Sequence, residues 1–339
     1  MNKTSLVITS IAGPDSAILQ EYSKSCAEQN IPFIVIGDTK SPDNFHIEGC
    51  DFWSIDRQAS LHFSLAPLVP TRHYARKNLG YLLAVEGGAD TIIETDDDNL
   101  PLEGFWNFGH RNRTVLAWDI KDQGWVNVYR HFSEDPIWPR GLPLEEFHRK
   151  SKGLSHFNQH EVHCPIQQGL ADRNPDVDAV YRLTYPLPIT FKTDLNIALG
   201  CNAWSPFNSQ NTFWFKEAMP LLYLPSYCSF RMTDIWRSFI AQRIAWANGW
   251  SILYHEPTVW QDRNDHNLLK DFEDEIPGYL NNSKIAAVLM DLDLRAGEDY
   301  LCQNLIACYD EMIKNGWVGK EEAQLVRAWS EDITAALTL

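Results

Sequence analysis

The chain has 339 residues, enough for one large or two ordinary domains, and 29 Lys and Arg against 45 Asp and Glu give a formal net charge of −16. A hydrophobic fraction of 44% with 22% charged residues is typical of a globular protein and excludes a disordered or fibrous one. The acidic balance excludes a nucleic-acid-binding protein, because affinity for a phosphate backbone comes mostly from clustered Lys and Arg. The 13 Trp and 12 Tyr provide flat amphipathic rings that suit the faces of sugars as well as a core.

No run of the sequence approaches the roughly 20 consecutive apolar residues that a membrane-spanning helix needs, and the N-terminal residues lead into a strand-like run rather than a signal sequence. We therefore expect a cytoplasmic protein without a transmembrane segment. The seven Cys lie scattered without a CxxC pair, so we expect reduced core thiols rather than disulfides or a zinc site.

The first part of the chain alternates between strand and helix patterns. Short apolar runs predict buried strands at residues 6–11, 32–38, 50–55, 91–95 and 114–118. Helices are predicted between them, over residues 16–29 and about 71–86. This alternation predicts an α/β fold with a mostly parallel sheet flanked by helices, in which ligands bind beyond the carboxyl ends of the strands.

The second part of the chain has weaker periodicity. Residues about 130 to 190 are rich in Pro, His, Asp and Gly, which predicts long ordered loops that frame a site. Strand and helix patterns return from about residue 198 to 260, and the pattern after residue 281 is helical. We therefore predict a main domain over residues 1–280 and a helical C-terminal extension over residues 281–339.

Three consecutive carboxylates, Asp96, Asp97 and Asp98, follow the predicted strand at 91–95. Acidic side chains that are packed together repel one another, and a bound cation offsets that repulsion. Oxygen ligands favour a hard ion, Mg²⁺ or Mn²⁺, with open positions for a diphosphate. In an extended segment Asp96 and Asp98 would point the same way and both act as ligands. The alternative is a solvated acidic turn.

The predicted helix over residues 71–86 carries Arg72, Arg76 and Gly80 at four-residue spacing on one face. A cationic stripe beside a small residue lets a phosphate or a nucleotide approach closely. A solvated helix face is the alternative.

Two later segments carry further candidates. Thr233 is a natural N-cap that places Asp234 in the first turn of a helix, where a carboxylate between Arg231 and Arg237 either accepts a proton from a hydroxyl or only caps the helix. In the polar loop 260–267, His266 is a candidate metal ligand and Arg263 a candidate phosphate contact.

Two polar clusters suit hydrogen bonding to sugar hydroxyls, with Asx turns and loop caps as the alternative. They contain Asp176, Asp178, Asn208, Gln210 and Asn211.

Taken in order, these motifs resemble the STELLO family of glycosyltransferase-like proteins. The resemblance spans roughly residues 5 to 280 and is carried by the blocks 76–82, 93–98, 175–179, 207–212, 230–234 and 263–267. More distantly, the strand with its acidic triplet is similar to the reversibly glycosylated polypeptides, which act as UDP-arabinopyranose mutases. The lack of a membrane anchor departs from the plant STELLO proteins and favours a free enzyme.

The resemblance implies a GT-A nucleotide-diphosphosugar fold and a metal-dependent glycosyltransferase that moves a sugar, most simply from a UDP-linked donor, to a glycan or glycolipid acceptor. It implies an Asp-x-Asp motif in which Asp96 and Asp98 bind Mn²⁺ or Mg²⁺ and Asp97 fills the middle position, with His266 as a late ligand and Asp234 as the base of an inverting reaction.

In the implied donor site, Asp38 contacts the nucleoside, and Ser10, Ile11, Ala12 and Gly13 line its pocket. Arg72, Arg76 or Lys77 provides the positive charge at the leaving group, and Arg231 belongs to the acceptor site. Two alternatives stay open: a sugar-nucleotide mutase, and a catalytically silent scaffold of glycan synthesis.

Overall fold

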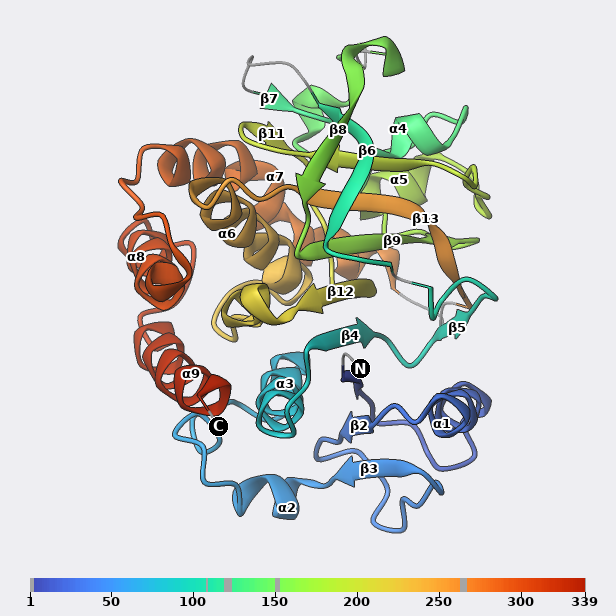
Figure 1. The fold of residues 1–339 in the computed structure, drawn as a ribbon, viewed down its shortest axis with the longest axis vertical. Coiled ribbons are helices and arrows are strands. Elements are labelled where there is room, and N and C mark those ends of the chain that lie inside the picture. Colours follow the sequence, from blue (N-terminus) through green and yellow to red (C-terminus); the bar gives the residue numbers. More distant parts are fainter. Residues whose placement is uncertain (1–2, 108, 119–123, 150–152, 263–266, 339) are drawn as a thin grey trace.

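A large mixed sheet flanked by helices runs through the molecule (Figure 1). The computed structural model describes residues 3–107, 109–118, 124–149, 153–262 and 267–338. Within these residues the sheet has 11 strands, in the order β3-β2-β1-β4-β12-β9-β13-β10-β6-β8, with β5 paired to β13. The predicted α/β class is therefore confirmed.

The first half of the sheet is parallel, as predicted. Its strands are β1 (Thr4–Thr9), β2 (Phe33–Ile36), β3 (Cys50–Trp53) and β4 (Thr91–Thr95). The helices between them are α1 (Ala17–Gln29), α2 (Ile55–Ala59) and α3 (Lys77–Glu86), the last preceded by the 3₁₀ turn η1 (Tyr74–Arg76). Because β1 pairs in parallel with both β2 and β4, the segments that follow these three strands meet at one edge of the sheet.

The second half of the sheet is mixed, which corrects the expectation of a mostly parallel sheet. Strand β12 (Asn211–Phe215) runs antiparallel to β4 and to β9 (Ile166–Asp172), and β9 runs parallel to β13 (Ile252–Gln261). The outer strands are β10 (Asn196–Leu199), β6 (Asn112–Trp118), β8 (Phe157–His163) and the short β5 (Asn99–Pro101). A separate two-stranded sheet joins β7 (Gly124–Trp125) and β11 (Ala203–Trp204).

The region 130–190 is therefore not only loops, because it supplies β8 and the central strand β9. It also contains the short helices α4 (Tyr129–Phe132) and α5 (Ala179–Thr184) and the 3₁₀ turns η2 (Leu144–Glu146) and η3 (Leu154–His156).

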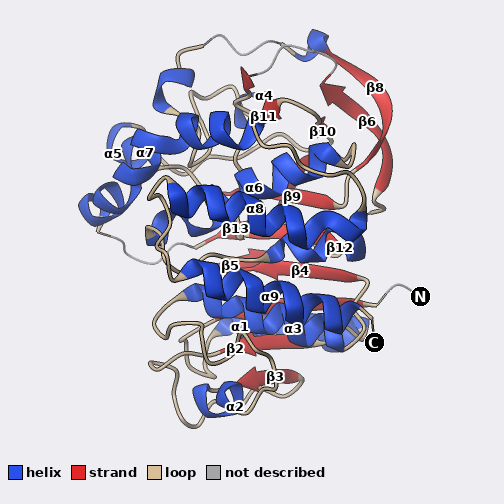
Figure 2. Ribbon diagram, turned by 90° about the vertical axis from the view of Figure 1, so that its left-hand side faces the viewer, coloured by secondary structure: helices blue, strands red, loops and turns tan. Residues whose placement is uncertain are grey.

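Longer helices make up most of the last third of the described chain. They are α6 (Thr233–Ala247), α7 (Leu268–Met290), α8 (Leu301–Lys314) and α9 (Glu322–Leu337), with the 3₁₀ segments η4 (Lys216–Leu222), η5 (Phe230–Met232) and η6 (Glu298–Tyr300). Figure 2 shows α3, α6, α8 and α9 on the same face of the sheet, whereas α1 covers the other face in Figure 1.

The C-terminal helices are built into the main body of the fold. The predicted boundary between residues 280 and 281 falls inside α7. Asp332 of α9 accepts hydrogen bonds from the backbone N–H groups of Ser64 and Leu65, at 2.9 and 2.8 Å. Trp329 and Val7 belong to one and the same apolar core. These helices therefore stabilise the sheet domain rather than forming an appendage.

The cysteines are free thiols, of which Cys26, Cys164 and Cys308 are buried as expected and Cys201 is exposed. Across the parts of the chain that the structure describes, no helix combines the length and the apolar character needed to cross a membrane.

Candidate functional site

A pocket of about 370 Å³ lies at the edge of the sheet where β1 and β2 end. Its lining comes from five places in the sequence: the end of β1, the end of β2, the segment that leads into α3, the turn after β4, and η5. Six predicted donor-site residues lie in this lining: Ser10, Ile11, Asp38, Arg72, Arg76 and Asp97. The parallel topology therefore brings together residues that are up to 87 positions apart, as Ser10 and Asp97 are.

Hydrogen bonds fix the two strand-end loops of the pocket. Ser10 Oγ donates to Asp97 Oδ2 and accepts from the backbone N–H of Ala12. The side chain of Asp38 accepts from the backbone N–H of His73, at 3.1 Å, and so ties the end of β2 to the segment before α3. Ala12 and Gly13 continue the Ser10 loop, but they are not among the residues that line the cavity.

Two arginines and Lys40 bring positive charge to the pocket lining. Arg76 is buried, with Nε donating to Gln58 Oε1 at 2.6 Å and Nη1 donating to the Val69 carbonyl at 2.8 Å, and burial lowers its pKa. Arg72 is exposed and has a φ of +57°, in the left-handed region that few residues other than Gly adopt. Strained residues of this kind cluster at functional sites, so the pocket rim is a candidate ligand contact.

An aromatic wall formed by His73, Tyr74 and Phe230 completes the pocket, and none of these three residues was predicted from the sequence to belong to the site. His73 and Tyr74 stack at 5.5 Å, and the ring of Phe230 meets both edge-on, at 5.3 and 4.9 Å. Burial lowers the pKa of His73 to about 4, although Asp38 acts in the opposite direction, so this imidazole is neutral at pH 7. Phe230 is 48% exposed and presents an apolar ring to the opening, which suits a planar base.

The acidic triplet forms a turn, because β4 ends at Thr95 and the backbone N–H of Asn99 donates to the Asp96 carbonyl. The predicted alternation of an extended segment is therefore wrong. Each carboxylate has a partner of its own: Asp96 pairs with Lys77, Asp97 accepts from Ser10, and Asp98 accepts from Gln261.

The chemistry of the triplet suits a hard cation. Burial raises the pKa of Asp96 to about 7, Lys77 opposes this rise, and the charge of Asp98 adds to it. A cation beside Asp96 and Asp98 would relieve that repulsion through carboxylate oxygens. No group of three or more His, Cys, Asp and Glu side chains arranged to hold a metal occurs among the described residues. The predicted ligand His266 and the predicted phosphate contact Arg263 lie outside the described residues.

Lys77 and Gly80 lie on the inner side of α3 and not in the pocket lining. Lys77 donates to the Thr95 carbonyl as well as to Asp96. A Cβ atom at Gly80 would lie 2.6 Å from Val7 and 2.9 Å from Ile36. The missing side chain therefore lets α3 pack closely on β1 and β2, which explains this glycine without a nucleotide.

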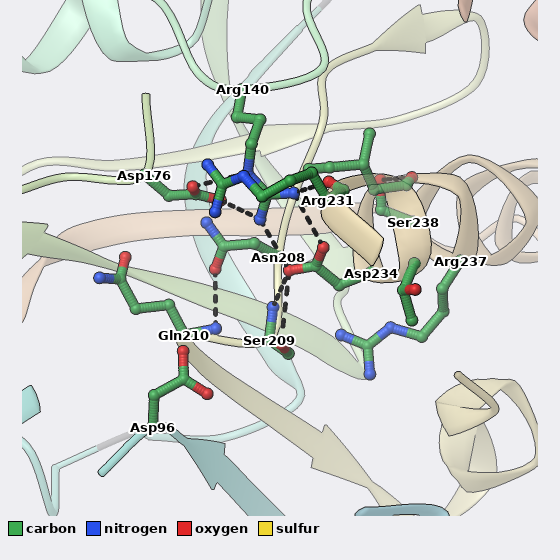
Figure 3. Close-up of polar contacts among 12 residues, drawn as sticks. Asp96, Arg140, Asp176, Asn208, Ser209, Gln210, Arg231, Asp234, Arg237 and Ser238 are labelled. Carbon is green, nitrogen blue, oxygen red and sulfur yellow. Dashed lines mark hydrogen bonds and ion pairs between the residues drawn. The ribbon is translucent and has the colours of Figure 1, made fainter. Parts of the chain in front are cut away.

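Asp234 lies at the centre of a buried polar cluster at the start of α6 (Figure 3). Arg140 donates to both of its carboxylate oxygens, at 3.1 and 3.0 Å, and to both oxygens of Asp176, at 2.8 Å each. The backbone N–H and hydroxyl of Ser209 donate to Asp234 as well, and Tyr74 Oη donates to Asp234 Oδ1 at 3.3 Å. The aromatic wall of the pocket is thereby tied to this cluster.

This environment weighs against the predicted role of Asp234 as a base. Burial alone would raise the pKa of Asp234, but Arg140 lowers it to about 2. A carboxylate that is held by an arginine and accepts several other hydrogen bonds is a weak proton acceptor at neutral pH. The expected flanking arginines pair elsewhere, Arg231 with Glu275 and Arg237 with Glu94. Thr233 is the first helical residue, and its side chain does not cap the helix.

The remaining predicted acceptor residues are mostly internal. Asp178 caps α5 through the backbone N–H of Tyr181, accepts from Trp138 Nε1, and has a pKa that burial raises to about 7. Asn211 is fully buried and donates to the Leu170 carbonyl and to Thr258.

Asn208 and Gln210 are 4% and 6% exposed, and their hydrogen bonds to neighbouring residues hold the turn before β12 in place. Arg140, which organises the whole cluster, was missed because nothing in its local sequence marks it.

Comparisons with known proteins show similarity to one family. The family model for STELLO glycosyltransferases matches residues 231–337. Two curated proteins of Arabidopsis thaliana are similar: "Probable glycosyltransferase STELLO2", 28% identical over 326 residues, and "Probable glycosyltransferase STELLO1", 27% identical over 328 residues. The alignments cover 88% and 89% of this chain and 41% of each relative, so the chain spans about two fifths of their length. The predicted resemblance to the STELLO family is thus confirmed.

Among solved structures, one described as "Crystal Structure of a Mycobacterial Protein" aligns with a TM-score of 0.42 and 12% identity, over 83% of this chain and 74% of that chain.

Proposed function

We propose that this chain is a metal-dependent glycosyltransferase of GT-A type that moves a sugar from a UDP-linked donor to a hydroxyl of a glycan or glycolipid. Two lines of support are the similarity to relatives named as probable glycosyltransferases and the parallel βαβ half of the sheet. The observation that carries the proposal is the pocket at the carboxyl edge, which joins two arginines, two aspartates and an aromatic wall. Open α/β sheets bind nucleotides at this edge.

The pocket residues divide into two groups by chemistry. Ser10, Asp38 and the exposed ring of Phe230 surround the space that we assign to the nucleoside, because they offer polar groups for a ribose and a flat apolar face for a base. Arg72 and Arg76 are the guanidinium groups that we assign to the diphosphate. These assignments leave Ile11 at the rim, where it is 50% exposed.

Asp96 and Asp98 would hold the Mn²⁺ or Mg²⁺ ion, because their oxygens match the preference of hard cations. The bound ion supplies electrostatic stabilisation of the negative charge on the departing nucleoside diphosphate. The guanidinium groups of Arg72 and Arg76 act in the same direction, since fixed positive charge at a leaving phosphate stabilises the charge that develops there.

On the acceptor side we assign Asp234 a structural role rather than a catalytic one. Its carboxylate anchors Arg140 and the start of α6 next to the pocket, which keeps the aromatic wall in place. Asp178 and Asn211 are 0% exposed and are left out of the acceptor site for that reason. Asp176, Asn208, Gln210 and Arg231 stay predicted contacts of the acceptor at the border of the buried cluster.

A thermal-shift screen of nucleotide sugars, with and without Mn²⁺, tests the proposal. A ligand at 100 times its dissociation constant stabilises the native state by about 2.7 kcal/mol, so the correct donor raises the melting temperature by several degrees in the presence of Mn²⁺. Arg72→Met should remove this rise, whereas Arg327→Met should not, because Arg327 lies on α9 in an exposed ion pair with Asp310 of α8. No shift with any nucleotide sugar would point to a silent scaffold.

Incubation with the responding donor then separates two enzyme classes. Release of the nucleoside diphosphate in the presence of glycan acceptors supports the transferase. Isomerisation of the sugar ring without transfer would contradict it in favour of a sugar-nucleotide mutase.

A further inference from the structure

The imidazole of His73 is held from several sides at the wall of the pocket. The backbone N–H of His73 donates to Asp38 Oδ2 at 3.1 Å. Its Nδ1 accepts from the backbone N–H of Ala75 at 3.0 Å, so the side chain caps the 3₁₀ turn η1. The ring also stacks on Tyr74, with an angle of 11° between the two planes. These contacts fix the orientation of the imidazole without a ligand.

The hydrogen bond at Nδ1 also determines which ring nitrogen carries the proton. A neutral imidazole has one N–H donor and one acceptor nitrogen, and the bond made by one nitrogen sets the state of the other. Because Nδ1 of His73 accepts a hydrogen bond, the proton lies on Nε2. Burial lowers the pKa of His73 to about 4, against the effect of Asp38, so the ring is neutral at pH 7. Nε2 is therefore an oriented and uncharged N–H donor.

The Nε2–H group of His73 is free to bind a ligand. No described residue forms a hydrogen bond with Nε2, and Nε2 is not one of the buried polar atoms that lack a partner. An atom that has no partner and is not buried is accessible, and the open space that His73 lines is the pocket. A ligand in the pocket can therefore accept a hydrogen bond from Nε2 without breaking a contact within the protein.

The surroundings of Nε2 favour a nucleobase over a phosphate as its partner. The positive charges that attract a phosphate belong to Arg72, Arg76 and Lys40. The exposed ring of Phe230, to which we assign the base, meets the His73 ring edge-on at 5.3 Å between ring centres. A base stacked on Phe230 thus lies next to the imidazole, where one of its polar edge groups can accept from Nε2.

We propose that His73 is a specificity-determining residue, whose Nε2–H donates to a carbonyl oxygen of the base and makes the pocket prefer uracil to cytosine. This inference rests on the proposed function, which places the nucleoside in this pocket. Where uracil, like thymine, carries the acceptor O4, cytosine carries an amino group, which is a donor. Two donors that face each other leave both groups unpaired, so a cytosine nucleotide binds less tightly.

A purely structural role of His73 predicts a different result. Loss of the cap on η1 would loosen the wall of the pocket and weaken the binding of every nucleotide to the same extent. Loss of the hydrogen-bond donor weakens the binding of a uracil nucleotide alone. The ratio of the affinities for UDP and CDP therefore separates the two roles.

The test measures the binding of UDP and of CDP by calorimetry at pH 7 in the wild type, His73→Asn and His73→Phe. Asn is a favoured N-cap, so its side-chain oxygen replaces Nδ1 as the acceptor for Ala75, but its shorter side chain does not extend to the position of Nε2. Phe retains a ring that stacks on Tyr74 and has no nitrogen. His62→Phe, at an exposed histidine paired with Glu86, is the matched control.

We expect the wild type and His62→Phe to bind UDP about fivefold or more tightly than CDP, which is the net effect of one hydrogen bond between uncharged groups. Both His73 variants should bind the two nucleotides with nearly equal affinity. A wild type without this preference, or a preference retained by either His73 variant with a wild-type melting temperature, would overturn the inference and leave the proposed function intact. A wild type that binds neither nucleotide would overturn both.

Discussion

Replacement of Arg140 by Met tests whether Asp234 is a structural anchor. Arg140 is 6% exposed and is paired with Asp176 and Asp234, which are 9% and 5% exposed. The variant leaves two buried carboxylates without their cation, and breaking a buried pair in this way costs about 3–5 kcal/mol. The depressed pKa of Asp234, about 2 against an ordinary 3.8, accounts for roughly 2.5 kcal/mol of this loss.

The pH dependence of the loss follows from the same carboxylate. In the wild type the pKa of Asp234 is lower in the folded state than in the unfolded state, so its contribution to stability is present above about pH 4 and is lost as the pH falls toward 2. In Arg140→Met the guanidinium group is gone, so burial raises the pKa of Asp234 above its value in the unfolded state. The variant therefore loses stability as the pH rises from about 4. The deficit relative to the wild type should therefore be larger at pH 7 than at pH 5.

Urea denaturation of both proteins at pH 5 and pH 7 measures the deficit, with Arg327→Met, at an exposed ion pair, as a control that should stay within about 0.5 kcal/mol. A deficit below 1 kcal/mol, or one that does not grow with pH, would refute the role of Arg140 as the cation that holds Asp234 ionised.

Three further changes probe the packing, the aromatic wall and the C-terminal helices. Gly80→Val should destabilise the fold by about 1–3 kcal/mol through overpacking between α3 and the sheet, whereas Gly124→Ala, which meets no atom within 4 Å, should cost far less in the same denaturation assay. Phe230→Ala should weaken UDP binding about fivefold or more in calorimetry and leave the melting temperature almost unchanged, because the ring is 48% exposed; unchanged affinity would exclude it from the nucleoside site. Asp332→Ala should destabilise the fold by about 1–3 kcal/mol, because two backbone N–H groups lose their acceptor, and an unaffected melting temperature would contradict the anchoring role of Asp332.

The parallel half of the fold was predictable because its strands are short apolar runs with clear ends. The run at 91–95 coincides with β4, and the predicted helix at 16–29 differs from α1 by one residue. Residues at the ends of such strands meet at one edge of the sheet, which is why Ser10, Asp38 and Asp97 could be grouped in advance.

The central strand β9 was not predictable from its pattern. It carries Gln167 and Gln168 in its interior, both buried, and both side chains form hydrogen bonds within the folded chain. Gln168 Oε1 accepts from the backbone N–H of Asn208, and Gln167 Nε2 donates to the Cys164 carbonyl. Polar residues with no apolar run indicate a loop unless these partners are known.

The buried cluster around Asp234 was equally hidden. Arg140 lies 36 positions from Asp176 and 94 positions from Asp234, and it comes from a segment with no regular pattern. The sequence therefore indicated the neighbouring Arg231 and Arg237 as partners, although the fold directs these to Glu275 and Glu94. Local spacing predicts partners within one helix or strand, but not across elements that only tertiary packing brings together.

Diffraction from crystals of this chain soaked with UDP and Mn²⁺ tests the central claim most directly. The account predicts electron density for the nucleoside between Ser10, Asp38 and Phe230, with the diphosphate toward Arg72 and an anomalous signal beside the carboxylates after β4. Nucleotide bound elsewhere on the molecule, with this pocket unchanged, would contradict it.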